Sequence, residues 1–120
     1  MDGTRAAALR DAASNLILNA LQASPSGGRV RVNARVENER LSVSVTDEGP
    51  GVPAEQRERI WEPFFTTKQR GTGLGLAIVR KRIEEAGGEA RLAPQRAGEG
   101  ARFVLTIPIQ VQSSKLQVQS

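Results

Sequence analysis

The sequence predicts an α/β fold, a two-layer sandwich in which helices pack on one face of a mixed, mostly antiparallel sheet. Two observations predict it: long segments repeat apolar residues at helical spacing, and shorter segments alternate apolar with polar residues. A chain of 120 residues has room for one modest core. We expect one domain over residues 1–109 and a polar tail at 110–120, where IQVQS and LQVQS nearly repeat. The tail is either an extra edge strand or a loose end, and we favour the loose end.

The first half of the chain predicts a helix followed by a hairpin. Apolar side chains recur at three- and four-residue steps from residue 4 to about residue 24, and SPSGG ends this helix. The stripe comprises Leu9, Ala13, Leu16 and Ala20. RVRVNARVE then alternates as a half-buried strand does, and LSVSVTD repeats the alternation. Asn38 and Glu39 lie between the two runs, so we expect them to turn an antiparallel hairpin.

The second half predicts four further elements after a glycine-rich loop. PAEQRERIWEP has a proline at each end and reads as one short helix. A second long helix is expected from about Gly73 to Ala86, with Gly87 and Gly88 as its stop. Its buried face comprises Leu76, Val79, Ile83 and Ala86. Two strands follow, near residues 89–94 and 101–109.

The composition excludes several classes of site. The chain has neither histidine nor cysteine, which rules out the usual zinc sites, Ser-His-Asp triads, histidine general bases and disulfides. Its net charge is +4, but the basic residues are dispersed and aromatic residues are few, so we expect an anionic small ligand and no nucleic acid. No apolar run approaches the ~20 residues that span a bilayer. We expect a cytoplasmic domain without membrane contact of its own.

Two asparagines on the first helix form a candidate metal site. Asn15 and Asn19 are four residues apart, so their side chains lie one above the other. One interpretation is a pair of surface amides. The other is a site for a hard cation, because amide oxygens suit Mg²⁺, which also binds substrate phosphates.

The loop DEGPGVP, after the second strand, is a candidate binding wall. Gly49 and Gly51 let the backbone bend sharply and approach a ligand closely. Asp47 can accept a hydrogen bond from an amino group such as that of adenine. An ordinary turn opened by Asp is the alternative. GPGVPA also matches a G-x-G-x-x-A dinucleotide fingerprint, but we reject that match because no long crossover helix follows.

Two further segments, GTGLGLAIV and EPFFTTK, are candidates for binding the phosphates of a ligand. Glycines at alternate positions that lead into a helix predict a phosphate site at the helix N-terminus, although the P-loop pattern is absent. In EPFFTTK, Phe64 and Phe65 would pack beneath a mobile segment and Lys68 would reach a phosphate. Taken alone, the glycines of GTGLGLAIV would be explained as a flexible linker, and the two phenylalanines of EPFFTTK as ordinary core residues. Together, the four segments predict an ATP site assembled from separate parts of the chain.

In this order and spacing, the four segments resemble motifs of the ATP-binding catalytic domain of bacterial sensor histidine kinases. NLILNALQA resembles the N box, DEGPGVP the G1 box, IWEPFFTTK the F box and GTGLGLAIV the G2 box. The resemblance covers roughly residues 5–109 and implies the Bergerat-type fold shared with Hsp90, DNA gyrase and MutL. That family usually has an extra strand before the N-box helix, so the chain resembles a domain that is slightly trimmed at its N-terminus.

The resemblance also implies roles for individual residues. Asn19 would be the principal Mg²⁺ ligand with Asn15 in support, and Asp47 would bind the adenine amino group. Asn19 and Lys68 would act in catalysis. The nucleotide contacts implied by the resemblance are Asn15, Asn19, Asp47, Gly49, Gly51, Phe64, Lys68, Gly71, Thr72, Gly73, Leu74 and Gly75.

The activity implied by the resemblance is transfer of the ATP γ-phosphoryl group to a histidine. In the Hsp90, gyrase and MutL branches, a glutamate one turn before the metal-binding asparagine activates water; here that position is Asn15, whose amide cannot remove a proton. The acceptor would lie on a separate histidine-bearing dimerisation domain, with a response regulator downstream. The alternatives are a regulatory ATP-binding module or serine kinase of the anti-sigma-factor type, and a scaffold that binds ATP with negligible transfer.

Overall fold

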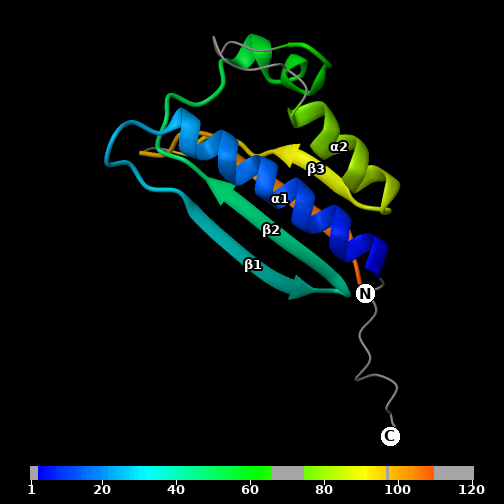
Figure 1. The fold of residues 1–120 in the computed structure, drawn as a ribbon. Coiled ribbons are helices and arrows are strands. Elements are labelled where there is room, and N and C mark those ends of the chain that lie inside the picture. Colours follow the sequence, from blue (N-terminus) through cyan, green and yellow to red (C-terminus); the bar gives the residue numbers. More distant parts are fainter. Residues whose placement is uncertain (1–2, 66–74, 97, 110–120) are drawn as a thin grey trace, which may run out of the picture.

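The computed structural model describes residues 3–65, 75–96 and 98–109 (Figure 1). Its elements, in chain order, are α1 (Gly3–Ala23), β1 (Arg31–Glu37), β2 (Arg40–Thr46), the 3-10 helices η1 (Ala54–Gln56) and η2 (Arg59–Trp61), α2 (Gly75–Glu85), β3 (Glu89–Leu92) and β4 (Arg102–Pro108). The tail at residues 110–120 lies outside the described residues. No helix within the described ranges is long and apolar enough to cross a membrane.

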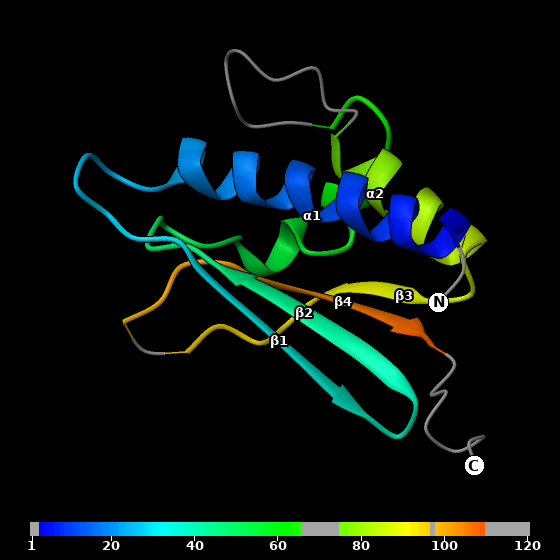
Figure 2. The same cartoon turned by 60° about the horizontal axis from the view of Figure 1, so that its bottom comes forward.

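The four described strands form one sheet in the order β1-β2-β4-β3. Both helices cover the same face of this sheet, α1 over β2 and β4 and α2 beside β3 (Figures 1 and 2). The predicted two-layer α/β architecture is therefore confirmed. We expected a mixed sheet, but every pairing between the described strands is antiparallel.

The hairpin between β1 and β2 forms as predicted, around Asn38 and Glu39. Glu37 pairs with Arg40, so the connection has two residues, and their φ angles are +54° and +59°. Two successive positive φ angles give a turn whose twist matches that of the flanking strands, and asparagine adopts this conformation readily. The local sequence therefore sets the register of the whole hairpin.

The core lies between α1, α2 and the central strands. The most deeply buried large side chains are Leu16, Val45, Val79, Ile83, Leu105 and Ile107. Three of the four buried positions on α1 are alanines, and such small residues bring the helix close to the sheet. These positions are Ala8, Ala12, Leu16 and Ala20, whereas Leu9 and Ala13 from the predicted stripe are only partly buried.

The segment between Pro53 and Pro63 differs from the prediction. Instead of one helix, it forms two short 3-10 helices, η1 and η2. Only Ile60 is buried among the residues of the two helices. A continuous helix would have little apolar surface to bury here, and helices of this length depend on tertiary packing.

Strand β1 also differs from the prediction. We expected it to be half-buried, but all seven of its residues are exposed. The reason is its place in the sheet: α1 packs on β2 and β4, and β1 lies beyond the helix layer as an edge strand (Figure 2).

Candidate nucleotide-binding site

Asp47 is a buried carboxylate at the end of β2, with 4% of its surface exposed. Its Oδ1 accepts hydrogen bonds from the amide of Gly49 at 2.8 Å and from the amide of Ala101 at 3.0 Å. Its own amide donates to the Ala101 carbonyl, and its carbonyl accepts from the Gly100 amide. The residues just before β4, together with Gly49 of the loop, thus hold both the backbone and the side chain of Asp47, and Oδ1 is committed to that support.

Gly100, just before β4, makes this arrangement possible. A Cβ on Gly100 would overlap Asp47 Oδ1 and would lie 2.6 Å from the Gly49 carbonyl oxygen. Real Cβ contacts are essentially never this short, so only glycine allows the three residues to approach. Gly100 was not among the predicted site residues, because its only signal in the sequence is a glycine before a strand.

The Asp47 loop rests on the C-terminal end of α1. A Cβ on Gly49 would lie 2.6 Å from the Ala23 carbonyl oxygen, and the Glu48 amide donates to Ser24 Oγ at 3.3 Å. Gly51 has a φ of +81° and lies against the side-chain amide of Gln95. Both predicted loop glycines therefore occupy positions where a side chain would be strained or would clash.

Asn15 and Asn19 are half-buried on α1, one turn apart as predicted. A Cβ on Gly75, the first residue of α2, would lie 3.9 Å from Asn19 Nδ2. Ala23, which supports the Asp47 loop, is one turn beyond Asn19. The C-terminal half of α1 thus carries the asparagine pair and lies against both the Asp47 loop and the start of α2. These three segments are far apart in sequence.

The predicted aromatic pair separates. Phe65 packs against the core beneath the guanidinium of Arg59, which lies 4.7 Å from the ring centroid. Phe64 is 74% exposed, and its φ of +69° is uncommon for a residue with a side chain. The other predicted site residues, Lys68, Gly71, Thr72, Gly73 and Leu74, lie outside the described residues.

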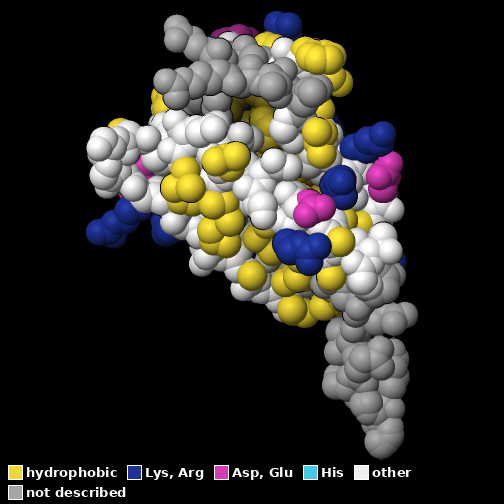
Figure 3. Space-filling model, in the orientation of Figure 1, with side chains coloured by type: hydrophobic (Ala, Val, Ile, Leu, Met, Phe, Trp, Pro, Cys, Tyr) yellow, Lys and Arg dark blue, Asp and Glu magenta, His cyan; other side chains and the backbone are white. Residues whose placement is uncertain are grey.

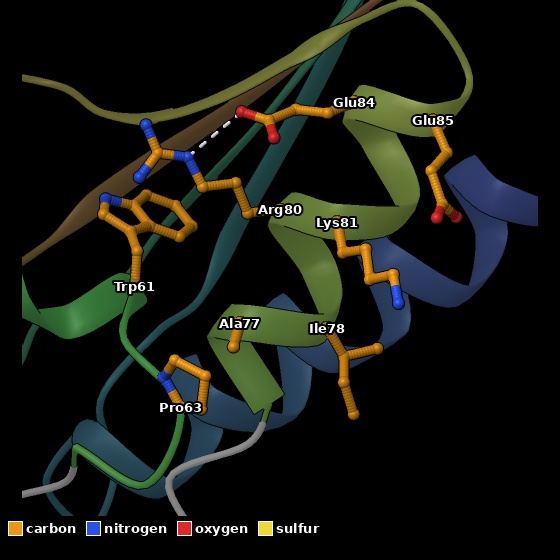
Figure 4. Close-up of a pocket in the computed structure, with 8 residues that line it drawn as sticks. All are labelled: Trp61, Pro63, Ala77, Ile78, Arg80, Lys81, Glu84 and Glu85. Atoms are coloured by element: carbon orange, nitrogen blue, oxygen red, sulfur yellow. Dashed lines mark hydrogen bonds and ion pairs between the residues drawn. The ribbon is translucent and has the colours of Figure 1, made fainter.

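A shallow groove runs along the outer side of α2 (Figure 4). Its wall is Trp61, whose ring meets Phe103 edge-on at a centroid distance of 5.7 Å. The guanidinium of Arg80 lies 5.3 Å from the Trp61 ring centroid, and its Nε is 3.2 Å from Glu84 Oε2. The groove is lined by Trp61, Pro63, Ala77, Ile78, Arg80, Lys81, Glu84 and Glu85. Ile78 is 42% exposed there.

Among the described residues, only a few protein side chains could coordinate a hard cation. Within those ranges, no group of three or more acidic, histidine or cysteine side chains comes together. The paired amides of Asn15 and Asn19 suit Mg²⁺ that completes its coordination with water and substrate phosphates.

Comparisons with known proteins agree with this geometry. Residues 4–111 match the family described as histidine kinase-, DNA gyrase B- and HSP90-like ATPases. Sensor histidine kinase ZraS from Escherichia coli O157:H7 is 45% identical over 97 residues, which cover 81% of this chain and 21% of ZraS. The chain therefore spans about a fifth of that relative.

Solved structures are also similar. The mycobacterial sensor histidine kinase MprB has a TM-score of 0.76 at 34% identity, covering 85% of this chain and 70% of the MprB chain. Full-length ShkA in complex with AMPPNP has a TM-score of 0.74 at 32% identity, covering 91% of this chain and 24% of the ShkA chain. The match over residues 4–111 shows that this chain belongs to the family of histidine kinase-, DNA gyrase B- and HSP90-like ATPases, as an ATP-binding domain of the sensor histidine kinase type.

Proposed function

We propose that this chain binds ATP with Mg²⁺ and donates the γ-phosphoryl group to a histidine on a partner domain. The observation that carries the proposal is the Asp47 carboxylate, which is buried and held by two amides in a loop that packs on the end of α1, the helix that carries both asparagines. A buried, oriented carboxylate in a loop wall is suited to reading an amino group of a ligand. We also propose a cytoplasmic location for the reaction, because ATP is available there.

Asp47 would select adenine through its second oxygen. Because Oδ1 is bonded to the amides of Gly49 and Ala101, the carboxylate plane is oriented before ligand arrives. Oδ2 would then accept from the adenine amino group. A hydrogen bond to a charged, sheltered acceptor contributes about 1.5–3 kcal/mol. Guanine presents a carbonyl at the same ring position, which would face the carboxylate unfavourably.

Asn19 would hold Mg²⁺, and Asn15 would support the metal and the phosphates. Asn19 fits this role because it lies beside Gly75 at the start of α2, where backbone amides favour an anion. When bound, Mg²⁺ neutralises charge on the β- and γ-phosphates during transfer. Lys68 and the glycines at 71, 73 and 75 would complete the phosphate contacts.

The nucleophile would be a histidine imidazole, which attacks the γ-phosphorus in line with the leaving oxygen. The bond from the γ-phosphorus to the β–γ bridging oxygen breaks, ADP leaves with that electron pair, and the imidazole's ring proton passes to solvent water. Water would be a poor competitor, because the amide of Asn15 cannot act as a base. The acceptor must be on another domain or chain, since this sequence has no histidine. A response regulator would take the phosphoryl group next.

The groove on α2 is our proposed docking surface for the histidine-bearing domain. Ala77 and Ile78 belong to the first turn of α2, directly after the proposed phosphate-binding glycines. A partner helix seated against Ile78 would therefore bring its histidine close to the γ-phosphate. The groove carries two cations, Arg80 and Lys81, and two carboxylates, Glu84 and Glu85, so the apolar contact at Ile78 and not net charge carries this proposal.

Calorimetric titration with ATP, ADP and GTP, with and without Mg²⁺, tests the nucleotide site. We expect saturable, adenine-selective binding that Mg²⁺ strengthens for ATP. Absence of nucleotide binding to the folded chain would contradict the proposal.

A second assay tests the phosphoryl acceptor. The chain is incubated with labelled ATP and a histidine-bearing helical domain of a sensor kinase. Label that is lost in acid identifies phosphohistidine, whereas acid-stable label would instead support a serine kinase of the anti-sigma-factor type. Binding without transfer to any such domain would indicate a scaffold.

A further inference from the structure

Arg57, between η1 and η2, differs from most of the described arginines. Those lie exposed at the surface, and Figure 3 shows basic side chains beside acidic ones on the helix side of the molecule. Arg57 is half-buried, and its Nη2 donates to the Ala93 carbonyl at 2.7 Å and to the Leu92 carbonyl at 3.1 Å. Hydrogen bonds from a charged donor are roughly twice as strong as neutral ones, so this contact ties residue 57 to the end of β3.

The segment that carries Arg57 has little else to fix its position. Its backbone hydrogen bonds are local and join residues three positions apart, whereas the two bonds of Arg57 reach 35 and 36 positions along the chain. Among the residues of η1 and η2, only Ile60 is buried. Short 3-10 helices depend on their surroundings for stability. The place of this segment on the fold therefore depends strongly on the Arg57 guanidinium.

The carbonyls that Arg57 binds belong to the same pair of strands that orients Asp47. The Ala93 amide donates to the Arg102 carbonyl at 2.8 Å, which joins the end of β3 to the start of β4. The residue before Arg102 is Ala101, whose amide donates to Asp47 Oδ1. Asp47 and Arg57 are thus attached to neighbouring points of one backbone support.

The chain between these two attachments contains the proposed adenine-binding loop. We call residues 47–57 the wall segment. Near its middle, Gly51 lies against the side-chain amide of Gln95, which belongs to the connection between β3 and β4. Because both ends and the middle of the wall segment rest on the same pair of strands, release of the end at Arg57 would let the whole segment shift.

We propose that Arg57 is a positioning residue for nucleotide binding, because its guanidinium fixes the far end of the wall segment and so keeps the Gly49–Gly51 bend in register with Asp47. The inference rests on the proposed function, since the wall segment is the proposed adenine site. Arg57 acts without touching the nucleotide, and its effect passes through the backbone. It should therefore influence the binding of every adenine nucleotide equally.

Hydrogen exchange tests the positioning in the absence of nucleotide. Arg57→Ala removes both bonds to the carbonyls, and Arg91→Ala is the matched control, because it removes an exposed arginine from β3. In Arg57→Ala, the Gly49 amide that donates to Asp47 should exchange roughly tenfold faster, while amides of β2 keep the rates of the parent. Faster exchange confined to η1 and η2 would show that Arg57 holds only its own segment and would overturn the proposal.

Calorimetry measures the consequence for binding. Arg57→Ala should weaken ATP and ADP about tenfold each, because both nucleotides carry adenine, and Mg²⁺ should still strengthen ATP binding. Arg91→Ala should bind both nucleotides as the parent does. A lower melting temperature with unchanged affinity well below it would give Arg57 a purely structural role and overturn the proposal.

Ethylguanidinium separates the loss of a hydrogen-bond donor from a general loss of structure. At tens of millimolar it should enter the space left by the Arg57 side chain and donate to the same carbonyls. Protection of the Gly49 amide and nucleotide affinity should then both return in Arg57→Ala, whereas sodium chloride at the same concentration should restore neither. Rescue of neither property would show that the missing guanidinium is not their cause.

The exchange data also separate this inference from the proposed function. A folded parent that binds no adenine nucleotide would contradict the proposed function. If Arg57→Ala still loosened the Gly49 amide in that case, the positioning role of Arg57 would stand and only the adenine site would be lost.

Discussion

Gly100 and Asp47 are in direct backbone contact, and the absence of a side chain on Gly100 sets the position of the Asp47 carboxylate. The Gly100 amide donates to the Asp47 carbonyl at 2.9 Å, and a Cβ on Gly100 would occupy the space of Asp47 Oδ1. The next residue, Ala101, donates its amide to that same oxygen. The start of β4 therefore positions the proposed adenine-binding group.

Gly100→Ala should displace the Asp47 carboxylate and weaken ATP binding by at least tenfold, as measured by calorimetry. The added methyl meets Oδ1 and the Gly49 backbone, and overpacking of this kind typically costs about 1–3 kcal/mol of stability. Gly3→Ala is the matched control, because a Cβ on Gly3 meets nothing within 4 Å. Unchanged affinity in Gly100→Ala would show that the loop relaxes without moving Asp47.

Asp47→Asn should weaken ATP binding about ten- to a hundredfold, corresponding to roughly 1–3 kcal/mol. The amide can keep the two backbone bonds through its oxygen, but it then presents an NH₂ group to the adenine amino group. The neighbouring Glu48→Gln retains an acceptor for the Arg29 amide and should bind ATP as the parent does. If Asp47→Asn keeps full affinity and adenine selectivity, another residue reads the base.

Asn19→Ala should remove the strengthening of ATP binding by Mg²⁺ and abolish phosphoryl transfer. Titration of ATP into the variant, with and without Mg²⁺, separates loss of the metal from loss of the fold. Gln22→Ala, an exposed amide on the same helix, is the control. A variant at Asn19 that retains the Mg²⁺ effect would remove this residue from the metal site.

Ile78→Asp should reduce transfer to a histidine-bearing domain while ATP affinity stays within about twofold. The reason is that Ile78 lies in the α2 groove, 42% exposed, where a carboxylate would disfavour an apolar partner. Leu18→Asp makes the same change at a residue that is 53% exposed on α1 and should leave transfer intact. Equal transfer rates for the two variants would place the docking surface elsewhere.

The local elements follow from short-range patterns. Asn38 and Glu39 between two alternating runs predict a two-residue turn, and both adopt the positive φ that it requires. The glycines at 49 and 51 likewise mark a bend that is closely packed in the structure. Such features depend on steric limits of a few neighbouring residues, so they can be predicted from the residues themselves.

The burial of each face depends on neighbours distant in sequence. The alternation in β1 predicted a half-buried strand, yet Val32 and Val36 are exposed because α1 lies over β2 and β4. The prolines at 53 and 63 predicted one helix, but the segment forms two 3-10 helices in which Ile60 is the only buried residue. Periodicity shows which side chains share a face, and it does not show which element covers that face.

The amino-acid order was therefore sufficient for most element types, for the hairpin turn and for the four separated segments that resemble an ATP site. The contact between Gly100 and Asp47, 53 residues apart, needed the complete fold, because the pairing of β2 with β4 brings Thr46 opposite Arg102. The complete fold also left β1 at the edge of the sheet. Contacts of this kind arise from strand order, and strand order is set by the packing of the whole chain.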